Sequence, residues 1–470
     1  MDNRKGPGYG PSSWADWSNQ SNDCPAAMTP VEVRAVVLSA GRSERFKSGH
    51  KALAPPLGPG LLAKALTTLS WAGVKSLVVA GHRGPQVTAE ALDLGAEVVE
   101  NPDYDRGMFS SVVTGLAKVT ELAPKAGVMV LPVDAAMIGG AVLIQLISFW
   151  LDQGEEAASV AVLPEYLGRL GHPPIMGPSI VQKVLASSGH GGLKGALAAL
   201  AGSAGEASEV EAGYRPFDGP RAGSALRFFS AFDGRILTDI DTQEDLADAL
   251  AAASPKPRPL TVREALTLLR LTGPSRKMAH ALTVAALALR MAAALNVPEP
   301  ELVFIGGLLH DLDHSSRRHD LVVAQRLAAL GFDDLAAIVG AHTELPEPWA
   351  RLTGHLGPVG DRHTDDHELY LNRHPSIIEA AFLVYLADKY AKGDRPVTLE
   401  ERFGAFIEHG GSQEALDSVR RRWEVAKSLE SYLADRLGDS PRDVALTPGD
   451  HPLERLTERL LGKAAAGLTQ

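Results

Sequence analysis

The stretch VVLSAGRSERFKSGHK, residues 36–51, decides the fold expected for the first half of the chain. An apolar, β-branched run ends at Gly41 and is followed by serines, two arginines and two lysines. Such a turn can bring backbone N–H groups and the positive end of the next helix toward an anion. A single glycine also fits an ordinary strand-to-helix turn, so a plain turn and a phosphate-binding loop both remain open.

The pattern that begins at this stretch continues through the first half. Short β-branched runs alternate with helical stretches rich in alanine and leucine, which predicts a mostly parallel sheet covered by helices. Beyond residue 260 apolar residues recur three and four apart, which predicts an all-helical domain. The expected strands are residues 33–40, 75–81, 96–101, 127–134 and 159–164, with one more inside 225–242.

The linker SPKPRPL, residues 254–260, carries three prolines that oppose helix continuation and therefore marks the expected domain boundary. The apolar tract 135–151 is interrupted by glycines and Gln145, so we expect a buried helix and no membrane span. The expected segments are a disordered leader over 1–30, an α/β domain over 31–253, the linker, a helical domain over 261–437, and a peripheral tail over 438–470.

Composition narrows the functional classes. The 470 residues carry a formal net charge of -11, which disfavours binding along a nucleic-acid backbone. The single cysteine, Cys24, cannot form an intrachain disulfide, and the first residues lack the apolar core of a signal peptide. We therefore expect a cytoplasmic protein without nucleic-acid or membrane partners.

Two acidic positions follow apolar strands in the first half. Asp134 ends the run VMVLPVD, where doubly wound sheets expose ligand-binding groups, so it suits either Mg²⁺ or a helix N-cap. The later cluster DIDTQED offers Asp239 and Asp241 as a second ligand. Thr242 and Asp245 of that cluster are expected to cap the following helix.

Several motifs occur in one order: LSAGRSERF with a following lysine, NPDYDRGMFSSVVTGL, LPVD, GRLGHPPIMGPSIV, GHGGLKGAL and DIDTQEDL. Together they resemble the nucleotidyltransferase family that includes molybdenum cofactor cytidylyltransferases and related guanylyltransferases. The resemblance covers nearly all of residues 33–250. It implies a Rossmann-like, GT-A-like mixed sheet and transfer of CMP from CTP to a molybdopterin-type cofactor, with release of pyrophosphate and a molybdoenzyme as the recipient.

The resemblance also implies roles for individual residues. Phosphates of the nucleoside triphosphate would lie among the loop residues, and Mg²⁺ would neutralise charge at the α-phosphate. Ala40 resembles the cytidine-using pattern and favours CTP over GTP. The implied phosphate contacts are Gly41, Ser43, Arg45 and Lys51, and the implied Mg²⁺ ligands are Asp134 and Asp241.

For three further residues the sequence leaves two possible roles open. His172, in GRLGHPP, either lines the acceptor site or forms a local turn contact. Ser110 and Ser111 either contact the nucleotide or cap a helix. The sequence also departs from the family pattern, because Lys47 could substitute for Lys51 and Ala136 stands where a proline is usual, so the loop geometry remains open.

In the second half, histidines and aspartates lie at the ends of apolar helical stretches. His310 shares a stripe with Val303, and Asp311 follows it in GLLHDLDH. A buried carboxylate needs a partner or a metal. His280 in KMAHALTVAAL and Asp388 in FLVYLADKY repeat this placement, so a metal site shared by the four is the better explanation.

The order H…HD…D, with ADKYAKGDRPVTLEERF after it, resembles the HD-domain metal-dependent phosphohydrolase superfamily over about residues 260–437. It implies His280, His310, Asp311 and Asp388 as ligands of a divalent metal, with Mn, Fe, Mg and Zn all open, and a metal-activated water that attacks a phosphoester. His319 and His342 would be ligands of a second metal or solvated, capping histidines.

Other polar groups of this half are less specific. Asp313 and His314 follow the ligand pair and could assist proton transfer. The insert 346–375 is expected to be a solvated loop, because the spacing of its histidines fits no standard zinc pattern. Those histidines are His355, His363, His367 and His374.

Two alternative functions stay open. The same nucleotidyltransferase fold serves acceptors such as sugar or polyol phosphates, and fold alone does not choose between them. One or both domains could instead be binding modules, with the HD half sensing a nucleotide or delivering the cofactor.

Overall fold

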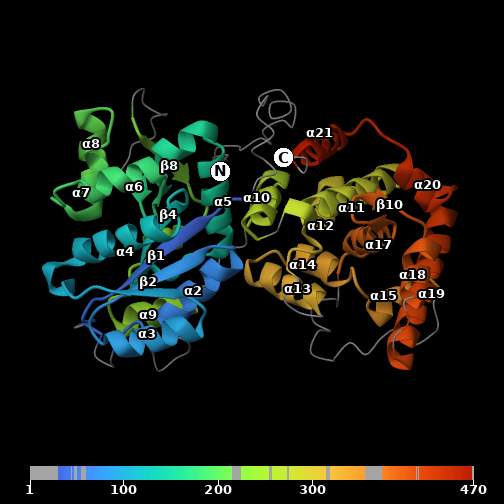
Figure 1. Cartoon of the computed structure of the whole chain (residues 1–470), viewed down its shortest axis with the longest axis horizontal. Coiled ribbons are helices and arrows are strands. Elements are labelled where there is room, and N and C mark those ends of the chain that lie inside the picture. Colours follow the sequence, from blue (N-terminus) through green and yellow to red (C-terminus); the bar gives the residue numbers. More distant parts are fainter. Residues whose placement is uncertain are drawn as a thin grey trace, which may run out of the picture. The chain divides into compact units, whose positions relative to one another are not determined.

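The computed structural model of the chain divides into two compact units, Val31–Pro259 and a second that begins at Leu260 (Figure 1). The boundary falls inside the expected linker. The expected leader with Cys24, and linker residues 254–256, lie outside the described residues. The structure describes residues 30–43, 45–46, 50–53, 60–213, 224–252, 257–272, 275–313, 318–354, 373–408, 410 and 412–467.

The first unit is a mixed sheet covered by helices on both faces. Its strands are β1 (Val33–Ser39), β2 (Lys75–Ala80), β3 (Glu97–Glu100), β4 (Gly127–Pro132), β5 (Ala161–Tyr166), β6 (Arg169–Leu170), β7 (Ile175–Met176) and β8 (Leu226–Ser230). Its helices are α2 (Leu61–Trp71), α3 (Gly84–Asp93), α4 (Met108–Leu122), α5 (Gly140–Leu151), α6 (Pro178–Leu185), α7 (Gly192–Ala198), α8 (Ala204–Ala212) and α9 (Gln243–Ala251), with 3-10 turns η2 (Tyr104–Arg106), η3 (Val133–Ala135), η4 (Gly154–Ser159) and η5 (Gly234–Leu237).

The sheet order is β3-β2-β1-β4-β7-β5-β6, and β8 pairs with β5. Strands β3, β2, β1 and β4 are parallel, whereas β7 is antiparallel to both β4 and β5. The expected Rossmann-like mixed sheet is therefore confirmed. Since β2 and β4 flank β1, the carboxyl ends of β1 and β4 lie side by side, where open α/β sheets bind ligands.

Alternation along the strands explains the layers. Val36 and Leu38 of β1 pack with Leu77 of β2 against α4 and α6, while α2, α3 and α5 pack with the sheet and one another in a second group. Ten of the twelve residues of α5 are buried, which confirms the buried helix expected within 135–151. No helix among the described residues is both long and apolar enough to cross a membrane.

The second unit is almost entirely helical, as expected. Its helices are α10 (Val262–Thr272), α11 (Ser275–Ala294), α12 (Pro300–Leu309), α13 (His319–Ala329), α14 (Asp333–Gly340), α15 (Glu347–Leu352), α17 (Pro375–Lys389), α18 (Leu399–Glu408), α19 (Gln413–Leu437), α20 (Pro441–Leu446) and α21 (Pro452–Gly467). One hairpin interrupts the helices, made by β9 (Ala391–Lys392) and β10 (Arg395–Pro396).

A glycine allows two helices of this unit, α11 and α12, to approach closely. A Cβ on Gly307 of α12 would lie 2.6 Å from Cα of Ala285 on α11, a distance that real Cβ atoms do not show. Glycine therefore lets the two helix backbones approach closely. This approach matters for the site, because α11 carries His280 and α12 ends beside His310.

The segment after Gly438 differs from the expected peripheral tail. It forms α20 and α21, which pack on α11, and Leu453, Leu456 and Leu460 are buried. Arg290 Nε of α11 donates to Glu454 Oε2 at 2.9 Å. The apolar residues recur three and four apart, so an amphipathic helix completes the core.

Candidate active sites

A pocket of about 540 Å³ opens in the first unit at the carboxyl ends of β1 and β4. The first loop supplies Ala40, Gly41, Ser43, Arg45 and Lys51 to its wall. The opposite wall includes Asp134 and Asp241. Segments far apart in the sequence converge here because β1 and β4 are neighbours in the sheet and the Ile240 N–H donates to the Asp134 carbonyl at 3.1 Å.

Charged side chains in this pocket form a network of ion pairs. Lys51 Nζ lies 2.8 Å from Asp134 Oδ2 and 3.4 Å from Asp241 Oδ1. Arg45 Nη1 lies 2.6 Å from Asp241 Oδ2, although the Arg45 side chain is 74% exposed. Of the two lysines left open, Lys51 thus lies in the pocket, and Lys47 lies outside the described residues.

The carboxylates at this end of the sheet suit a hard cation. Oxygen atoms of Asp134, Asp239 and Asp241 lie within 4.8 Å of one another. Carboxylate oxygens are the ligands that Mg²⁺ prefers, so the donor set fits the expected ion. Burial, followed by the charges of Asp134 and Asp241, raises the pKa of Asp239, which is a sign of crowded negative charge.

The loop itself carries polar atoms that lack partners. Ser43 adopts a left-handed conformation with φ 56°, and within the described part of the chain neither its buried Oγ nor Oγ of Ser39 has a hydrogen-bond partner. His50, which also lines the pocket, fixes the loop by donating from Nε2 to the Gly41 carbonyl at 2.9 Å. Unsatisfied polar atoms and backbone strain are typical of ligand-binding loops.

The loop differs from expectation in one respect. The next described helix after Gly41 is α2, which begins at Leu61, so no helix start follows the glycine directly. Gly41 has a free position for a Cβ, with no atom within 4 Å. Among the described residues of this loop, the side chains of Arg45 and Lys51 bring positive charge to the pocket.

Three other predicted residues are placed as follows. Asn101 Nδ2 donates to Oγ of both Ser110 and Ser111 at 2.9 Å, and only Ser111 lines the pocket. Neither serine side chain caps α4, which has no side-chain cap. His172 is exposed and does not line the pocket, and its backbone N–H donates to the Ile236 carbonyl at 2.9 Å.

The acidic cluster before α9 separates into two roles. Asp241 faces the pocket, whereas Thr242 and Asp245 form a reciprocal capping box at the start of α9. This confirms the predicted caps. Asp134 is part of η3 and pairs with Lys51, so a helix N-cap is not its role.

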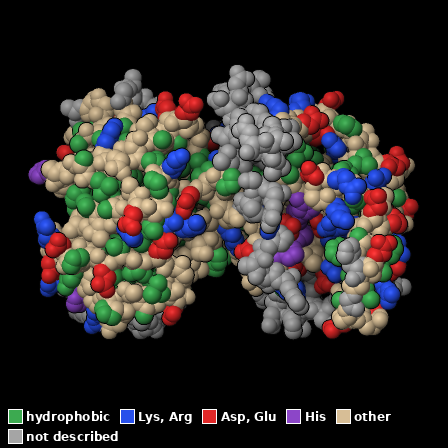
Figure 2. Space-filling view, viewed as in Figure 1, with side chains coloured by type: hydrophobic (Ala, Val, Ile, Leu, Met, Phe, Trp, Pro, Cys, Tyr) green, Lys and Arg blue, Asp and Glu red, His purple; other side chains and the backbone are tan. Residues whose placement is uncertain are grey.

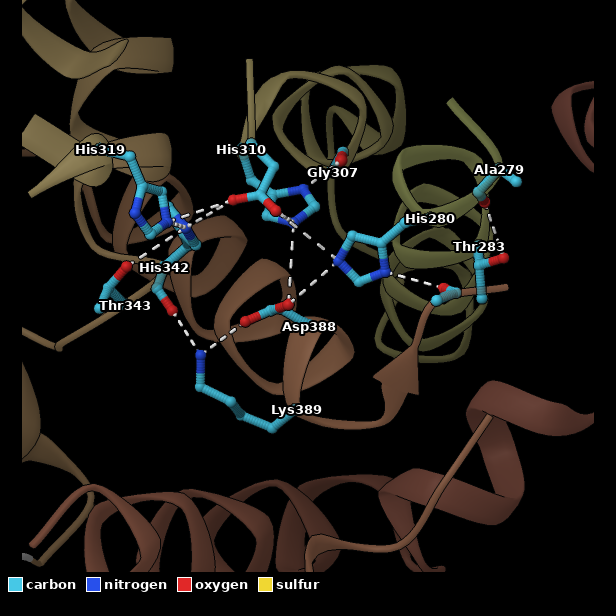
Figure 3. Close-up of polar contacts among 12 residues, drawn as sticks. Ala279, His280, Thr283, Gly307, His310, His319, His342, Thr343, Asp388 and Lys389 are labelled. Carbon is cyan, nitrogen blue, oxygen red and sulfur yellow. Dashed lines mark hydrogen bonds and ion pairs between the residues drawn. The ribbon is translucent and has the colours of Figure 1, made fainter. Parts of the chain in front are cut away.

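In the second unit, six predicted ligands from five helical segments meet at one place (Figure 3). Figure 2 shows histidine and acidic side chains gathered on the visible face of this unit. Metal-binding geometry is available to two sets, His280 with His310 and Asp311, and Asp311 with His319 and His342. Asp388 Oδ1 joins the first set, at 3.4 Å from His280 Nε2 and 3.7 Å from His310 Nε2.

Backbone carbonyls fix three of the four imidazoles. Nδ1 of His280, His310 and His342 donates to the carbonyls of Gly393, Gly307 and Val339 at 2.8, 2.7 and 2.7 Å (Figure 3). With the Nδ1 proton so engaged, Nε2 of each neutral ring keeps its lone pair and faces the cluster. This outer support is typical of metal-ligating histidines.

One buried atom tests whether a metal fits. His310 has an exposed fraction of 0%, and its Nε2 has no hydrogen-bond partner among the residues that the structure describes. A buried, unpaired imidazole nitrogen is costly unless something coordinates it. Imidazole and carboxylate together suit a transition metal or Mg²⁺, so the donor set fits a divalent cation without choosing its identity.

Asp311 belongs to both ligand sets. Its Oδ2 lies 3.9 Å from His280 Nε2 and 3.7 Å from His310 Nε2, whereas its Oδ1 lies 3.2 Å from His319 Nε2 and 3.5 Å from His342 Nε2. One carboxylate oxygen therefore faces each set. This arrangement can bridge two cations, and His319 and His342 lie within the cluster, away from the solvated positions that were the alternative.

Protonation equilibria in the cluster are strongly shifted. Burial lowers the pKa of His310 to about 4. Burial alone would lower the pKa of His280, but the hydrogen bond and charge of Asp388 raise it. The hydrogen bond with Asp311 raises the pKa of His319, and the surrounding positive groups hold the pKa of Asp388 well below its usual range despite its burial.

Two supports of this site were not predicted. Lys389 Nζ donates to Asp388 Oδ2 at 2.6 Å and to the His342 carbonyl at 2.9 Å, so it ties together ligands of both sets (Figure 3). Gly393, in the β9–β10 hairpin, orients His280. The quoted motif ADKYAKGD contained both residues, but a contact through a backbone carbonyl leaves no mark in residue type.

The structure describes only some of the other polar residues singled out in this half. His314, His355, His363 and His367 lie outside the described residues. His374 accepts a hydrogen bond from the N–H of Ser376 and caps α17, so it has a structural role. The charge of Asp313 opposes the effect of burial on Arg326, whose pKa is lowered to about 10.

Comparisons with known proteins match both halves. Residues 35–204 match the model of the MobA-like NTP transferase domain, and residues 278–393 match the model of the HD domain. A curated relative, "Bifunctional IPC transferase and DIPP synthase" of Rubrobacter xylanophilus, is 40% identical over 95 residues, which are 19% of this chain. The chain spans only 22% of the length of that relative.

Solved structures are also similar to part of the chain. Rv0371c from Mycobacterium tuberculosis is 24% identical and covers 47% of this chain and 100% of its own, with a TM-score of 0.35. Molybdopterin-guanine dinucleotide biosynthesis protein A from Archaeoglobus fulgidus is 17% identical and covers 46% and 96%, with a TM-score of 0.30. By these two family models, the chain carries a MobA-like NTP transferase domain over residues 35–204 and an HD domain over residues 278–393.

Proposed function

We propose that the first unit transfers CMP from CTP to a molybdopterin-type cofactor in the cytoplasm, with release of pyrophosphate, and that a molybdoenzyme receives the product. The observation that carries this proposal is the meeting of Lys51, Arg45, Asp134 and Asp241 in the pocket at the ends of β1 and β4. Cations for phosphates and carboxylates for a metal lie together there, as nucleotidyl transfer requires.

Each group has a distinct task in this proposal. Asp134 and Asp241 would hold Mg²⁺, which neutralises the charge that develops on the phosphates. Lys51 and Arg45 exchange their carboxylate partners for phosphate oxygens when the nucleotide binds. The acceptor phosphate oxygen attacks the α-phosphorus, and the bond to the pyrophosphate oxygen breaks. Positioning supplies most of the rate enhancement.

The test is anaerobic pyrophosphate release with Mg²⁺ and molybdopterin-type cofactor, with CTP compared against GTP. We expect release that depends on the cofactor, is faster with CTP and falls about 10³-fold in Asp134→Ala. A folded Asp134→Ala protein with full activity would contradict the site. Silence with both nucleotides would contradict the substrates.

One observation supports a second class of acceptor substrate. The 40% identical relative bears the name of a different transferase and no reference to molybdopterin. A sugar or polyol phosphate is therefore the second candidate acceptor for the same chemistry. The same assay, with a panel of phosphorylated polyols in place of the cofactor, separates the two.

For the second unit we propose metal-dependent hydrolysis of a phosphoester. The observation that carries it is the orphaned Nε2 of buried His310, inside a cluster whose other imidazoles also aim Nε2 inward. A divalent cation bound there would acidify water and neutralise phosphate charge. The chain's own residues hold the geometry: carbonyls fix the rings, and Lys389 fixes Asp388.

The test is phosphate release from a panel of phosphoesters after loading with Mn²⁺, Fe²⁺, Mg²⁺ or Zn²⁺ separately. We expect turnover with at least one metal and its loss in Asp311→Ala. A metal-loaded protein that binds a nucleotide without consuming any phosphoester would instead be a sensor, and the hydrolase proposal would fail.

A further inference from the structure

An arginine of α18 stands beside the metal-ligand cluster with its donors free. Arg402 Nη2 lies 3.6 Å from Asp388 Oδ1, too far for a hydrogen bond. The guanidinium makes no hydrogen bond to another described residue, and it is 22% exposed. A fork of N–H donors is therefore available next to the predicted ligands, in the geometry that suits a phosphate.

Neutralising Asp388 does not require this arginine. Lys389 Nζ already contacts Asp388 Oδ2 at 2.6 Å, and His280 lies at 3.4 Å from the other oxygen. Asp388 therefore lies beside both Lys389 and Arg402, in addition to any bound cation. The site with a divalent metal carries excess positive charge, which attracts an anion.

An exposed aromatic ring lies one helical turn further along. The Phe406 ring centroid lies 5.9 Å from Arg402 Cζ, and the side chain is 55% exposed. Phe403 on the same helix is instead buried and stacks on Trp423. Phe403 therefore serves the core, whereas Phe406 presents its ring beside the free guanidinium.

We propose that α18 forms the substrate-binding side of the HD site, with Arg402 binding the substrate phosphate and Phe406 stacking on an aromatic base. The substrate class is then a nucleoside monophosphate. This inference rests on the proposed hydrolase function. A water oxygen bonds to phosphorus, the ester P–O bond breaks, and the released nucleoside oxygen takes a proton from that water, which leaves a nucleoside and inorganic phosphate.

The experiment compares adenosine 5′-monophosphate with ribose 5-phosphate, which keeps the phosphate and sugar but lacks the base. In the metal-loaded full chain, Arg402→Gln should raise KM for both about 10- to 100-fold, and Arg402→Lys should restore part of the loss. Phe406→Ala should raise KM about 10-fold for the nucleotide and less than about 2-fold for ribose 5-phosphate.

Matched controls separate binding from general damage. Arg420→Gln removes the same charge from an exposed position of α19, and Leu352→Ala removes an exposed apolar side chain from α15. Both should keep wild-type KM. The metal content of Arg402→Gln should equal that of the wild type, since its role is to bind substrate and not to hold the metal.

A second readout does not need turnover. Equilibrium dialysis measures binding of a non-hydrolysable phosphonate analogue of the nucleotide to the full chain. The second unit should bind the analogue about 10-fold more weakly in Arg402→Gln than in the wild type. Nucleotide binding by the unchanged first unit is the same in every protein compared.

The outcomes distinguish the two proposals. If the wild type hydrolyses a phosphoester but Arg402→Gln behaves like Arg420→Gln, the present inference is overturned and the hydrolase function stands. Equal effects of Phe406→Ala on both substrates would overturn the base-stacking role. If the wild type hydrolyses nothing, the hydrolase proposal fails, and the dialysis result alone supports or overturns the binding role of Arg402.

Discussion

The two sites hold their acidic groups in opposite ways. In the first unit, Asp134 and Asp241 pair with Lys51 and Arg45, whose side chains extend from a loop. In the second unit, Asp311 and Asp388 lie among imidazoles carried by packed helices, and backbone carbonyls fix three of those rings. Lysine and arginine pair with both aspartates of the first site, whereas the second site, which also has Lys389 beside Asp388, aims imidazole Nε2 atoms at its aspartates.

This difference indicates how each site uses its metal. Side-chain cations can leave the carboxylates for phosphates, so we infer that the first site takes up Mg²⁺ together with the nucleotide. The second site has a buried nitrogen lone pair to which no described residue donates a hydrogen bond, so we infer that it would retain a metal between turnovers. The predictions below test this contrast.

The largest expected effect is on metal content. Asp311 belongs to both ligand sets, so Asp311→Ala should abolish metal retention at both after dialysis, whereas His319→Ala should lose only the second set. Elemental analysis of the dialysed proteins measures this. Asp134→Ala is the control and should retain wild-type content, because the first site is not expected to hold metal alone. Retention by Asp311→Ala would contradict the shared carboxylate.

The next prediction concerns Lys51 of the first site, whose substitution should have opposite effects on nucleotidyl transfer and on Mg²⁺ binding. Lys51→Gln should lower nucleotidyl transfer about 100-fold but strengthen Mg²⁺ binding without nucleotide about 10-fold, because the ammonium no longer competes for Asp134 and Asp241. Calorimetric titration with Mg²⁺ measures the binding. Lys75→Gln, at an exposed position, should change neither. Weaker Mg²⁺ binding in Lys51→Gln would break the comparison.

The third prediction concerns the close packing of α11 and α12, which position ligands of the second site. Gly307→Ala should destabilise the second unit by about 1–3 kcal/mol, because the added methyl group meets the α11 backbone at Ala285. Thermal unfolding measures this loss. Gly404→Ala, where no atom lies within 4 Å of the new methyl group, should be neutral or stabilising by up to about 1 kcal/mol. Equal stability of the two variants would refute the close approach of α11 and α12.

The smallest effect is the release of protons on metal binding. The pKa values of His280 and His319 are raised, which favours their protonated forms, while His310, with its pKa at about 4, is already neutral. Metal ligation needs neutral imidazole, so binding should release protons and should strengthen as the pH rises from 6 to 8. Calorimetry in buffers of different ionisation enthalpy measures the release, and His319→Gln should reduce it. Binding that weakens with rising pH would contradict the assignment.

Much of the fold was predictable because long apolar runs dominate it. Strands such as β1 and β2 match their expected ranges within about a residue. The two-residue strands β6 and β7 are too short to show a period. The tail was misjudged, although Leu453, Leu456 and Leu460 carry a helical spacing, because a short amphipathic segment does not reveal which core it completes.

The sites were predictable where residue type carries the chemistry. His310 and Asp311 follow an apolar helix, a position that is costly without a partner. Lys389 and Arg402 were missed because a lysine or arginine near a helix is ordinary, and their value depends on which oxygen each one faces. The orientation of His280 by Gly393 depends on a backbone carbonyl, which any residue could supply.

The most direct test of two separate active sites measures both reactions on the same preparations of wild type, Asp134→Ala and Asp311→Ala. Pyrophosphate release should fall about 10³-fold only in Asp134→Ala, and phosphate release from a phosphoester should fall about 10³-fold only in Asp311→Ala. If one substitution removed both activities from a folded protein, or if neither affected its own reaction, the account of two independent sites would be contradicted.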